Sequence, residues 1–500
     1  MEPLALAWNV LTTTPAVFAA FGGVAWGIIG GALPGISPSI AMALLLPFTF
    51  TMEPVVALIL LISTYVGAEY GGSIPAILIR TPGTNAAAAT TIDGYEMQKQ
   101  GRGGEALGIS LVAGVIGGLF GIILLVLLAE PLARVALLFT PPAYFALGIL
   151  GLSVVASLTE GSLVKGFMAG IVGLMIATVG GDPQTGVMRF TFDRPELMSG
   201  IPPILVMVGV FAVSELLVQS GLPAWDRTGR GTRVKLPSWK LIWRCRRALG
   251  IGSGIGAFEG AMPGAGGTVA AFMSYNEAKR WSKTPEEFGK GSPEAIAAPE
   301  AANNTVTATT LVPTLAFGIP GSNSTAILLA GLLFHGLIPG PLLFEKYPDL
   351  IYGLFGGLFV ANFSQLPIGI LIMTPCIWLV NSPKPYLLAF IFALVFSGIY
   401  SVDSSIFHVE LVLMFGVIGY VFRWLEFPFL PLVLGVILGY MVESNYRRSL
   451  QVSDGDYAIF IEDPVSAGLL AAAVLLILVS LLRNRRHARR LAKAREERPA

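Results

Sequence analysis

The sequence has little charge for its length. Only 13% of its 500 residues are Asp, Glu, Lys or Arg, about half the share of a soluble globular domain, whereas 54% are hydrophobic and 59 are glycine. A soluble protein of this size would need a charged surface, and this composition cannot provide one. Lipid must therefore cover part of the exterior, which indicates an integral membrane protein.

The sequence also lacks the common motifs of enzymes and of metal or cofactor sites. Its two cysteines, Cys245 and Cys376, share no spacing typical of a disulfide framework or a metal site. It contains no HExxH, Gly-x-Ser-x-Gly or P-loop lysine motif. We therefore expect no catalytic activity, no cofactor and no ATP hydrolysis through a P-loop. A net charge of +1 likewise predicts no nucleic-acid partner.

Several apolar windows are long enough to span a bilayer, which takes roughly 20 residues. Backbone groups in hydrocarbon must bond internally, so these windows are expected to be helices. No Lys or Arg precedes Arg80, so the N-terminal region lacks the basic start of a cleaved signal peptide, and we expect its first apolar stretch to be retained. The clearest windows are 107–129, 201–218, 350–380, 387–400, 408–423 and 467–482.

Three segments of the chain recur in the same order, which indicates an internal duplication. Their offsets are 229, 238 and 242 positions. The strongest match has the pattern Pro-x6-Pro-Gly-(Ser/Thr)-Asn at identical spacing in both copies. The three pairs are Gly31–Gly35 with Gly260–Gly264, Ile74–Asn85 with Val312–Asn323, and Pro141–Tyr144 with Pro383–Tyr386.

Lys and Arg concentrate in cytoplasmic loops, so their positions predict how the two halves are oriented. If the basic linker between the halves and the basic tail are both cytoplasmic, the halves have opposite orientations, as in many secondary transporters. We predict an all-α polytopic membrane protein with two inverted-topology repeats, discontinuous helices and one C-terminal transmembrane helix. The predicted parts are a first repeat at 1–220, a basic cytoplasmic linker at 221–248, a second repeat at 249–443, and an external loop, final transmembrane helix and basic cytoplasmic tail at 444–500.

The second Pro-Gly motif of each half is the preferred substrate and ion site. Proline removes a backbone donor and glycine allows unusual backbone angles, so each motif predicts a break between short helices. In membranes such breaks occur where freed backbone groups line a polar cavity. A half-helix N-terminus favours an anion, whereas carbonyl, hydroxyl and amide oxygens suit Na⁺. The candidates are Ser73, Thr81, Pro82, Gly83, Thr84 and Asn85 in the first half, and Asn303, Asn304, Thr305, Pro320, Gly321, Ser322, Asn323, Ser324 and Thr325 in the second.

The alternative is that these small residues only bend the helices and let them pack closely. Their recurrence in both halves favours a site. The first Pro-Gly motif of each half is a weaker candidate and is expected to serve mainly as a bend. Its residues are Pro34, Gly35 and Ser37 in the first half, and Pro263 and Gly264 in the second.

Charges within apolar stretches are functional candidates by default. Arg80 could pair with a substrate carboxylate, although Gly318 takes its place in the second half. His335 could relay a proton, but a lone histidine is more often hydrogen-bonded within a packed bundle. Internal ion pairs or interfacial positions are favoured for four of the remaining charges, Glu160, Lys165, Glu215 and Asp403, and a site role stays open for Glu69 and Glu259.

Four stretches carry a resemblance to a known family: GALPGISPSIAMALLLPFT, YGGSIPAILIRTPGTNAAAATTIDGYEMQKQGRGGEALGI, GAMPGAGGTVAAFMSYNEAKR and FGIPGSNSTAILLAGLLFHGLIPGP. The most specific part is the Pro-Gly-Thr segment followed by Thr91–Tyr95 and Gly101–Leu107. In these stretches the sequence resembles the TctA family, the large membrane subunit of tripartite tricarboxylate transporters. The resemblance covers about residues 11–479.

The resemblance implies a three-part system in the bacterial inner membrane. A periplasmic solute-binding protein would capture the carboxylate, a small transmembrane subunit would accompany this chain, and this chain would form the translocation route. Symport with Na⁺ or H⁺, rather than ATP, would drive uptake of di- or tricarboxylates. Two other functions stay open: a stand-alone organic-anion channel or exporter without a binding protein, and a membrane-embedded enzyme, for which the sequence offers no nucleophile or metal set.

Overall fold

The structure is a computed structural model that describes residues 5, 7–8, 10, 13–33, 35–158, 162–182, 184–222, 233–262, 266–380 and 382–496. Over these ranges, nine helices are long and apolar enough to cross a membrane. The strands found there are the two-residue β1 (Gly180–Gly181) and β2 (Met188–Arg189), which pair antiparallel with Gly180 opposite Arg189. The prediction of an all-α polytopic membrane protein is confirmed.

The chain forms two compact units. Unit 1 comprises Met1–Leu137 and Ile204–Tyr420, and unit 2 comprises Leu138–Pro203 and Val421–Ala500. Each unit combines segments from both halves of the sequence. The compact units therefore do not follow the boundaries of the proposed repeats, and the inverted-repeat arrangement stays a prediction.

Unit 1 contains the helices that carry the candidate site residues. Its elements up to the linker are α2 (Thr14–Ala32), α3 (Pro38–Leu45), η1 (Leu46–Thr51), α4 (Pro54–Ile79), η2 (Ala86–Ala88), α5 (Thr90–Lys99), α6 (Gly103–Ala136), nearly all of α9 (Pro203–Met207), the π-helical η4 (Val208–Val213) and α10 (Ser214–Gly221). Its later elements are α11 (Trp239–Arg244), α12 (Arg246–Ala261), α13 (Gly266–Trp281), η5 (Pro285–Glu287), α14 (Pro293–Thr309), α15 (Leu311–Phe317), α16 (Asn323–Phe334), α17 (Pro341–Lys346), α18 (Pro348–Leu371), α19 (Met373–Val380), α20 (Lys384–Asp403) and most of α21 (Ile406–Trp424).

Helices α2 and α4 pack closely because glycines line their contact. A Cβ at Gly27 would lie 2.2 Å from the Thr64 carbonyl oxygen, and a Cβ at Gly67 would lie 2.3 Å from the Val24 carbonyl oxygen. Small residues let two backbones approach in this way in membrane helix pairs. The close contact buries most of α4, including the polar side chains that form part of the site.

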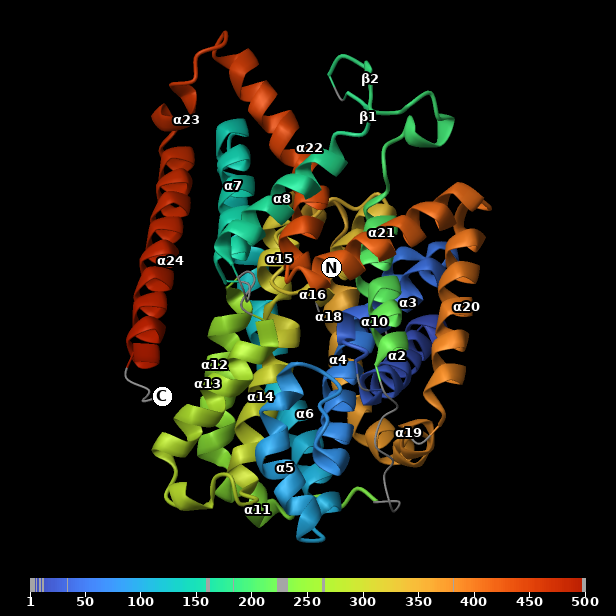
Figure 1. The fold of residues 1–500 in the computed structure, drawn as a ribbon, viewed down its shortest axis with the longest axis vertical. Helices are drawn as coiled ribbons and strands as arrows, with labels where there is room; N and C mark the ends of the chain where they lie inside the picture. The colour runs from blue at the N-terminus through green and yellow to red at the C-terminus, as the bar shows by residue number, and fades with distance from the viewer. Residues whose placement is uncertain are drawn as a thin grey trace. The chain divides into compact units, whose positions relative to one another are not determined.

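Helix α14 forms the second buried element of unit 1. It packs against α6 and α12, again through glycine: a Cβ at Gly117 would lie 2.1 Å from the Ala301 carbonyl oxygen, and one at Gly252 would lie 2.2 Å from that of Ala298. Every residue from Ala295 to Thr309 is buried. Figure 1 shows α14 among α5, α6, α12 and α13. Polar side chains on this helix must therefore find partners inside the protein.

The helices before the two second Pro-Gly motifs end in the same way. Helix α4 continues through Pro75 and ends at Arg80, which has a left-handed backbone with φ of 58°. Helix α15 continues through Pro313 and ends at Gly318, with φ of 72°. Both halves thus have the predicted break, because each helix ends at a left-handed residue two positions before the proline of its Pro-Gly motif, Pro82 or Pro320. Glycine adopts this conformation freely, whereas for arginine it costs roughly 1–2 kcal/mol.

Basic segments from both halves lie at one end of unit 1. The Lys235 amide donates to the Gly104 carbonyl oxygen at 2.8 Å, and the Gln100 side chain donates to the Lys290 carbonyl oxygen at 2.8 Å. Figure 1 shows α5 and α11 at this lower end of the unit. The positive charges near Lys99 and Arg102, in the described part of the linker and around Lys283 therefore share one side. This arrangement is compatible with a single cytoplasmic face.

Unit 2 holds α7 (Pro141–Leu158), α8 (Leu163–Ala177), β1, β2, η3 (Pro195–Leu197), α22 (Phe429–Val452), α23 (Ile459–Glu462) and α24 (Pro464–Glu496). Helix α22 packs on α8, where a Cβ at Gly173 would lie 2.0 Å from the Leu432 carbonyl oxygen. The apolar part of α24, Pro464–Leu482, is long enough to span a membrane, which agrees with the predicted C-terminal transmembrane helix.

Candidate binding site

The first tip, Thr81–Asn85, folds back onto the helices that precede it. The Gly83 amide donates a 3.0 Å hydrogen bond to the Gly72 carbonyl oxygen in α4. A Cβ at Gly83 would lie 1.9 Å from the Gly31 carbonyl oxygen at the end of α2. A residue larger than glycine does not fit there, so this tip sits against the start of the first Pro-Gly motif of the same half.

Hydroxyl groups of the first tip stabilise the turn itself. The Thr84 hydroxyl is buried and accepts a hydrogen bond from the Ala87 amide at 3.3 Å. The Thr81 hydroxyl donates to the Ile79 carbonyl oxygen at 3.4 Å. Pro82 is half-buried between them. These side chains stabilise the conformation of the tip, because both hydroxyl groups form hydrogen bonds to nearby backbone groups.

The second tip, Pro320–Asn323, leads directly into α16. Ser322 caps this helix: its hydroxyl accepts from the Thr325 amide at 3.2 Å, and the Thr325 hydroxyl accepts from the Ser322 amide at 2.9 Å. This reciprocal pair is a capping box. A Cβ at Gly321 would lie 2.9 Å from the Thr310 Cβ, so glycine again allows a close approach.

The matched asparagines of the two tips project away from these networks. Asn85 and Asn323 are exposed, whereas Thr84 and Ser324 beside them are buried. No hydrogen bond joins either asparagine side chain to another described residue. Asn323 is also the first residue of α16, where backbone N–H groups lack helical partners and attract anions. Both tips therefore present an unengaged amide beside a broken helix.

A buried polar seam runs between α4 and α14, next to the second tip. Three α4 side chains at successive helical turns face it: Tyr65, Glu69 and Ser73. The Tyr65 hydroxyl lies 3.3 Å from the Ser322 hydroxyl. The partners of these three side chains are Ser322, Asn303 and Glu300, respectively. The residue numbers rise along α4 while those of the partners fall. The two helices are antiparallel here, as inverted repeats would require.

Among the described residues, Glu69 has a single hydrogen-bond donor. The side-chain amide of Asn303 donates to its carboxylate at 2.8 Å, and both side chains are buried. The Asn303 amide oxygen, Oδ1, has no partner among the described residues. An isolated buried carboxylate is costly, so a proton or a cation is needed to neutralise Glu69.

Glu300 is held far more completely. Its carboxylate accepts hydrogen bonds from the hydroxyls of Ser73 (2.6 Å) and Ser110 (2.9 Å), and also from the Thr90 hydroxyl. These three donors come from α4, α6 and α5, while Glu300 itself belongs to α14. The carboxylate thus joins four helices from both halves, and its oxygens are largely satisfied without a cation.

The remaining predicted residues on α14 have different environments. Thr305 donates toward the Gly117 and Ala301 carbonyl oxygens, both at 2.8 Å, so it serves helix packing. The Asn304 side chain donates to the Glu300 carbonyl oxygen at 3.0 Å, and its Oδ1 is buried without a partner among the described residues. Asn303 alone of the three contacts the Glu69 carboxylate.

The weaker candidates lie apart from the seam. Arg80 is exposed, and its guanidinium lies 5.8 Å from the centroid of the Tyr95 ring. Ser37 caps α3 by accepting from the Ile40 amide at 3.4 Å. Gly35 has φ of +89° and approaches Gln219. Pro34, Pro263 and Gly264 lie outside the described residues.

The other charged candidates are explained mostly by local partners. The Lys165 amine donates to the Leu425 carbonyl oxygen at 2.7 Å, and Glu215 accepts from the Gln219 side chain at 2.8 Å. Glu259 is buried, and His335 caps the end of α16. Two candidates stay untested, because Glu160 and the side chain of Asp403 lie outside the described part.

Sequence reasoning missed Glu300 and the hydroxyls around it. One signal was present: Glu300 is an acidic residue in an alanine-rich stretch, directly after Pro299 and shortly before Asn303. Reasoning from Pro-Gly motifs alone passed over it, because Ser73, Thr90 and Ser110 converge on it from distant positions. Only the packing of α4, α5 and α6 around α14 reveals the group.

Asp93 forms a second buried connection between the halves. Its carboxylate accepts from the amides of Gly289, Gly291 and Ser292 at 2.8–3.0 Å, and from the Tyr275 hydroxyl at 2.9 Å. The three amides precede the N-terminus of α14, where a negative charge is favoured. Asp93 therefore fixes α5 to the start of the helix that carries Glu300 and Asn303.

The sequence is similar to one protein family and to two proteins of Agrobacterium vitis. Residues 17–434 match the profile of the tripartite tricarboxylate transporter TctA family. A 52.8 kDa Agrobacterium vitis protein, described as uncharacterized and from the TAR-I ttuC′ 3′ region, is 37% identical over 486 residues, 96% of each chain. A second, from the TAR-II ttuC′ 3′ region of the same organism, is 31% identical over 45% of this chain and 94% of its own length. No solved structure matches.

Proposed function

The chain belongs to the tripartite tricarboxylate transporter TctA family, and from this premise we propose that it is the translocation subunit of a binding-protein-dependent symporter for di- or tricarboxylates. The coupling ion is Na⁺ or H⁺. A periplasmic solute-binding protein delivers the substrate, and a small transmembrane subunit completes the complex in the bacterial inner membrane. The polar seam in unit 1, with its two buried glutamates of unequal hydrogen bonding, is the observation that carries this proposal.

The coupling cation is assigned to Glu69. Within the described part of the chain its carboxylate has one donor, Asn303, and the Oδ1 of that same side chain has no partner. A proton on Glu69 would neutralise it directly. Na⁺ would instead take oxygen ligands from the Glu69 carboxylate and from Asn303, which suit a hard cation. The Glu300 carboxylate already accepts hydrogen bonds from three hydroxyls, so in this proposal it does not bind the coupling cation.

The substrate anion is assigned to the two tips. Asn85 and Asn323 offer unengaged amide groups, and the first turn of α16 offers free backbone N–H groups that favour a carboxylate. The second tip is tied to the seam through Ser322, whose hydroxyl meets Tyr65 one helical turn from Glu69. Neutralising Glu69 can thus alter the packing at the tip that holds the anion. This link is the proposed basis of symport.

Charge balance explains why symport is needed. Each elementary charge moved through 100 mV is worth roughly 2.3 kcal/mol. A divalent or trivalent carboxylate entering a negative cytoplasm therefore requires several accompanying cations. The seam supplies one buried acid that needs a cation, and the substrate itself can carry further Na⁺ or protons.

Reconstituted uptake tests the proposal. Proteoliposomes with this chain, the small membrane subunit and the solute-binding protein are given a panel of carboxylates, with Na⁺ and pH gradients imposed independently. Accumulation should require the binding protein and one of the two gradients. Uptake that needs ATP but no gradient would contradict the proposal. Carboxylate flux that is the same with and without the binding protein would instead support a stand-alone organic-anion channel or exporter.

A further inference from the structure

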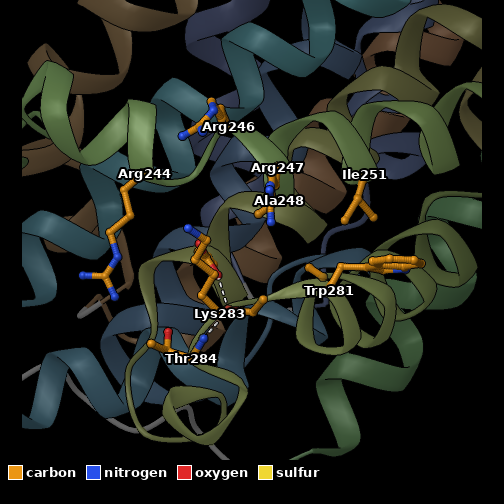
Figure 2. Close-up of a pocket in the computed structure, with 11 residues that line it drawn as sticks. Arg244, Arg246, Arg247, Ala248, Ile251, Trp281, Lys283 and Thr284 are labelled. Carbon is orange, nitrogen blue, oxygen red and sulfur yellow. Dashed lines mark hydrogen bonds between the residues drawn. The ribbon is translucent and has the colours of Figure 1, made fainter.

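A basic hollow of about 330 Å³ opens at the end of unit 1 where α12 begins and α13 ends. Figure 2 shows Arg244 and Arg246 on one side of it, Ile251 and Trp281 on the other, and Lys283 and Thr284 below Arg247. The hollow thus has a cationic side and an apolar side. It is separate from the polar seam, whose residues are absent from its lining.

Two of the cations in this hollow have no partner for their side chains among the residues that the structure describes. Arg244 pairs with Glu287 at 3.0 Å, and Arg246 donates to the Trp243 carbonyl oxygen at 2.9 Å. Arg247 and Lys283 make no ion pair or hydrogen bond with another described side chain. The acidic residue in the lining, Glu294, accepts a hydrogen bond from Ser282 at 2.5 Å. Unpaired positive charge in a hollow attracts an anion.

An apolar surface continues from the same place. A second, more open hollow of about 530 Å³ is lined by Gly250, Ile251 and Trp281 and shares both Arg246 and Arg247 with the first. Beyond it the outer face of α12 is uncovered, because a Cβ at Gly250 or Gly254 would meet nothing within 4 Å. Phe258, one turn further, is 65% exposed.

Three exposed tryptophans lie in or near the segments that line the hollow. Trp239, Trp243 and Trp281 are each at least 60% exposed among the basic residues. Tryptophan is enriched where a membrane meets water, and basic pockets on the cytoplasmic side of membrane helices bind anionic lipid headgroups. A soluble anion would use only the cationic hollow. A phospholipid would use the cations and the adjoining apolar face together.

We propose that the hollow between α12 and α13 binds the phosphate headgroup of an anionic phospholipid, with Arg247 and Lys283 as its main cationic contacts. One acyl chain lies over Ile251 and Trp281 and along the open face of α12. This inference does not depend on the transport function proposed above.

Native mass spectrometry of the purified full chain in detergent tests this assignment. Phosphatidylglycerol and phosphatidylcholine are titrated separately, and citrate and inorganic phosphate are added as competitors. We expect phosphatidylglycerol to be retained at least tenfold more strongly than phosphatidylcholine. Equal retention of both lipids would overturn the proposal. Displacement of phosphatidylglycerol by millimolar inorganic phosphate or citrate would also overturn it, because the site would then recognise a soluble anion.

Paired variants separate the hollow from general surface charge. Arg247→Ala with Lys283→Ala should weaken phosphatidylglycerol binding about ten- to thirtyfold, since each cation near a membrane surface contributes about 1 kcal/mol. Lys240→Ala with Lys290→Ala removes the same charge from exposed positions outside the hollow and should change binding less than twofold. Arg247→Lys with Lys283→Arg should keep binding. Equal losses in the first two pairs, or none in the first, would overturn the assignment.

Discussion

Asn303 donates a 2.8 Å hydrogen bond to Glu69 and thereby joins α14 to α4 across 234 positions of the sequence. Both side chains are buried, and the amide oxygen of Asn303 is left without a partner among the described residues. Ser322, at the N-terminus of α16, meets Tyr65 one turn earlier on α4. Glu69 is therefore in contact with α14 of the second half, and it lies one turn from the contact between α4 and the tip proposed to hold the substrate. A change in its charge is expected to alter both contacts.

Replacing either exposed tip asparagine should impair transport without harming the fold. Asn85→Ala and Asn323→Ala remove amides that bond to no described residue, so folding loses little. We expect carboxylate uptake to fall at least tenfold, about 1.4 kcal/mol of lost binding, with near-normal expression. Gln451→Ala, at an exposed amide of unit 2, is the matched control. Wild-type uptake by both asparagine variants would remove the tips from the binding site.

A methyl group at Gly83 should destabilise unit 1. The added Cβ would lie 1.9 Å from the Gly31 carbonyl oxygen, so the backbone must shift at a cost of about 1–3 kcal/mol. Gly22→Ala places a methyl group on α2 with nothing within 4 Å and should leave stability unchanged or slightly raised. Thermal unfolding in detergent compares the two. An unchanged melting temperature for Gly83→Ala would show that the tip does not sit against α2 as described.

Asp93 should matter for stability far more than other acids of α5. Asp93→Ala leaves three backbone amides and the Tyr275 hydroxyl without their buried acceptor, which should cost about 3 kcal/mol or more. Glu96→Ala breaks only a surface pair with Lys99 and should cost less than about 1 kcal/mol. Equal melting temperatures for the two variants would contradict the role assigned to Asp93.

The β1–β2 hairpin of unit 2 should be less stable in acid than at neutral pH. Amides of Thr185 and Gln184 and the Arg447 guanidinium hold the pKa of Asp182 well below its usual range. Because the folded pKa is depressed, its stabilisation is complete above about pH 4, the ordinary value for aspartate, and is lost as pH falls toward the folded pKa. The protection of the Gln184 and Thr185 amides from hydrogen exchange, taken relative to their intrinsic exchange rates at each pH, should therefore be high at neutral pH and fall in acid. Asp182→Asn should remove this pH dependence, and an unaltered profile would contradict the account.

The membrane fold could be predicted from the sequence because it depends on composition and local pattern. Long apolar windows and the scarcity of charge leave helices in lipid as the available solution. The matched Pro-Gly motifs located both tips. They also located the helix breaks, since α4 and α15 end at Arg80 and Gly318, two residues before Pro82 and Pro320. No propensity rule expects arginine in a left-handed conformation there.

The seam could be predicted only in part. Glu69 stood out as a charge in an apolar stretch, and Asn303 as an amide near the second motif, but nothing local connects them. Glu300 owes its environment to hydroxyls on three helices, so its role depends on tertiary packing. Thr305 and Thr325 show the converse. Their hydroxyls fitted an ion site by type, yet Thr305 bonds to carbonyl oxygens of its own helix and of α6, and Thr325 bonds within the cap of α16.

Glu69→Gln tests the central claim most directly. Glutamine keeps the shape of a neutral Glu69 but cannot bind or release the coupling cation, so it should separate transport from its driving force. Proteoliposomes with all three components are compared in two assays, accumulation driven by an imposed Na⁺ or pH gradient and exchange of labelled for unlabelled carboxylate at equal concentrations. Glu345→Gln, at an exposed acid of unit 1, is the control and should behave as wild type.

The account predicts that Glu69→Gln loses gradient-driven accumulation at least tenfold while exchange persists, because the substrate tips stay intact. Loss of both activities with intact folding would assign Glu69 to substrate binding instead of coupling. Accumulation by Glu69→Gln with the same dependence on the Na⁺ and pH gradients as wild type would contradict the claim that this buried carboxylate carries the coupling ion.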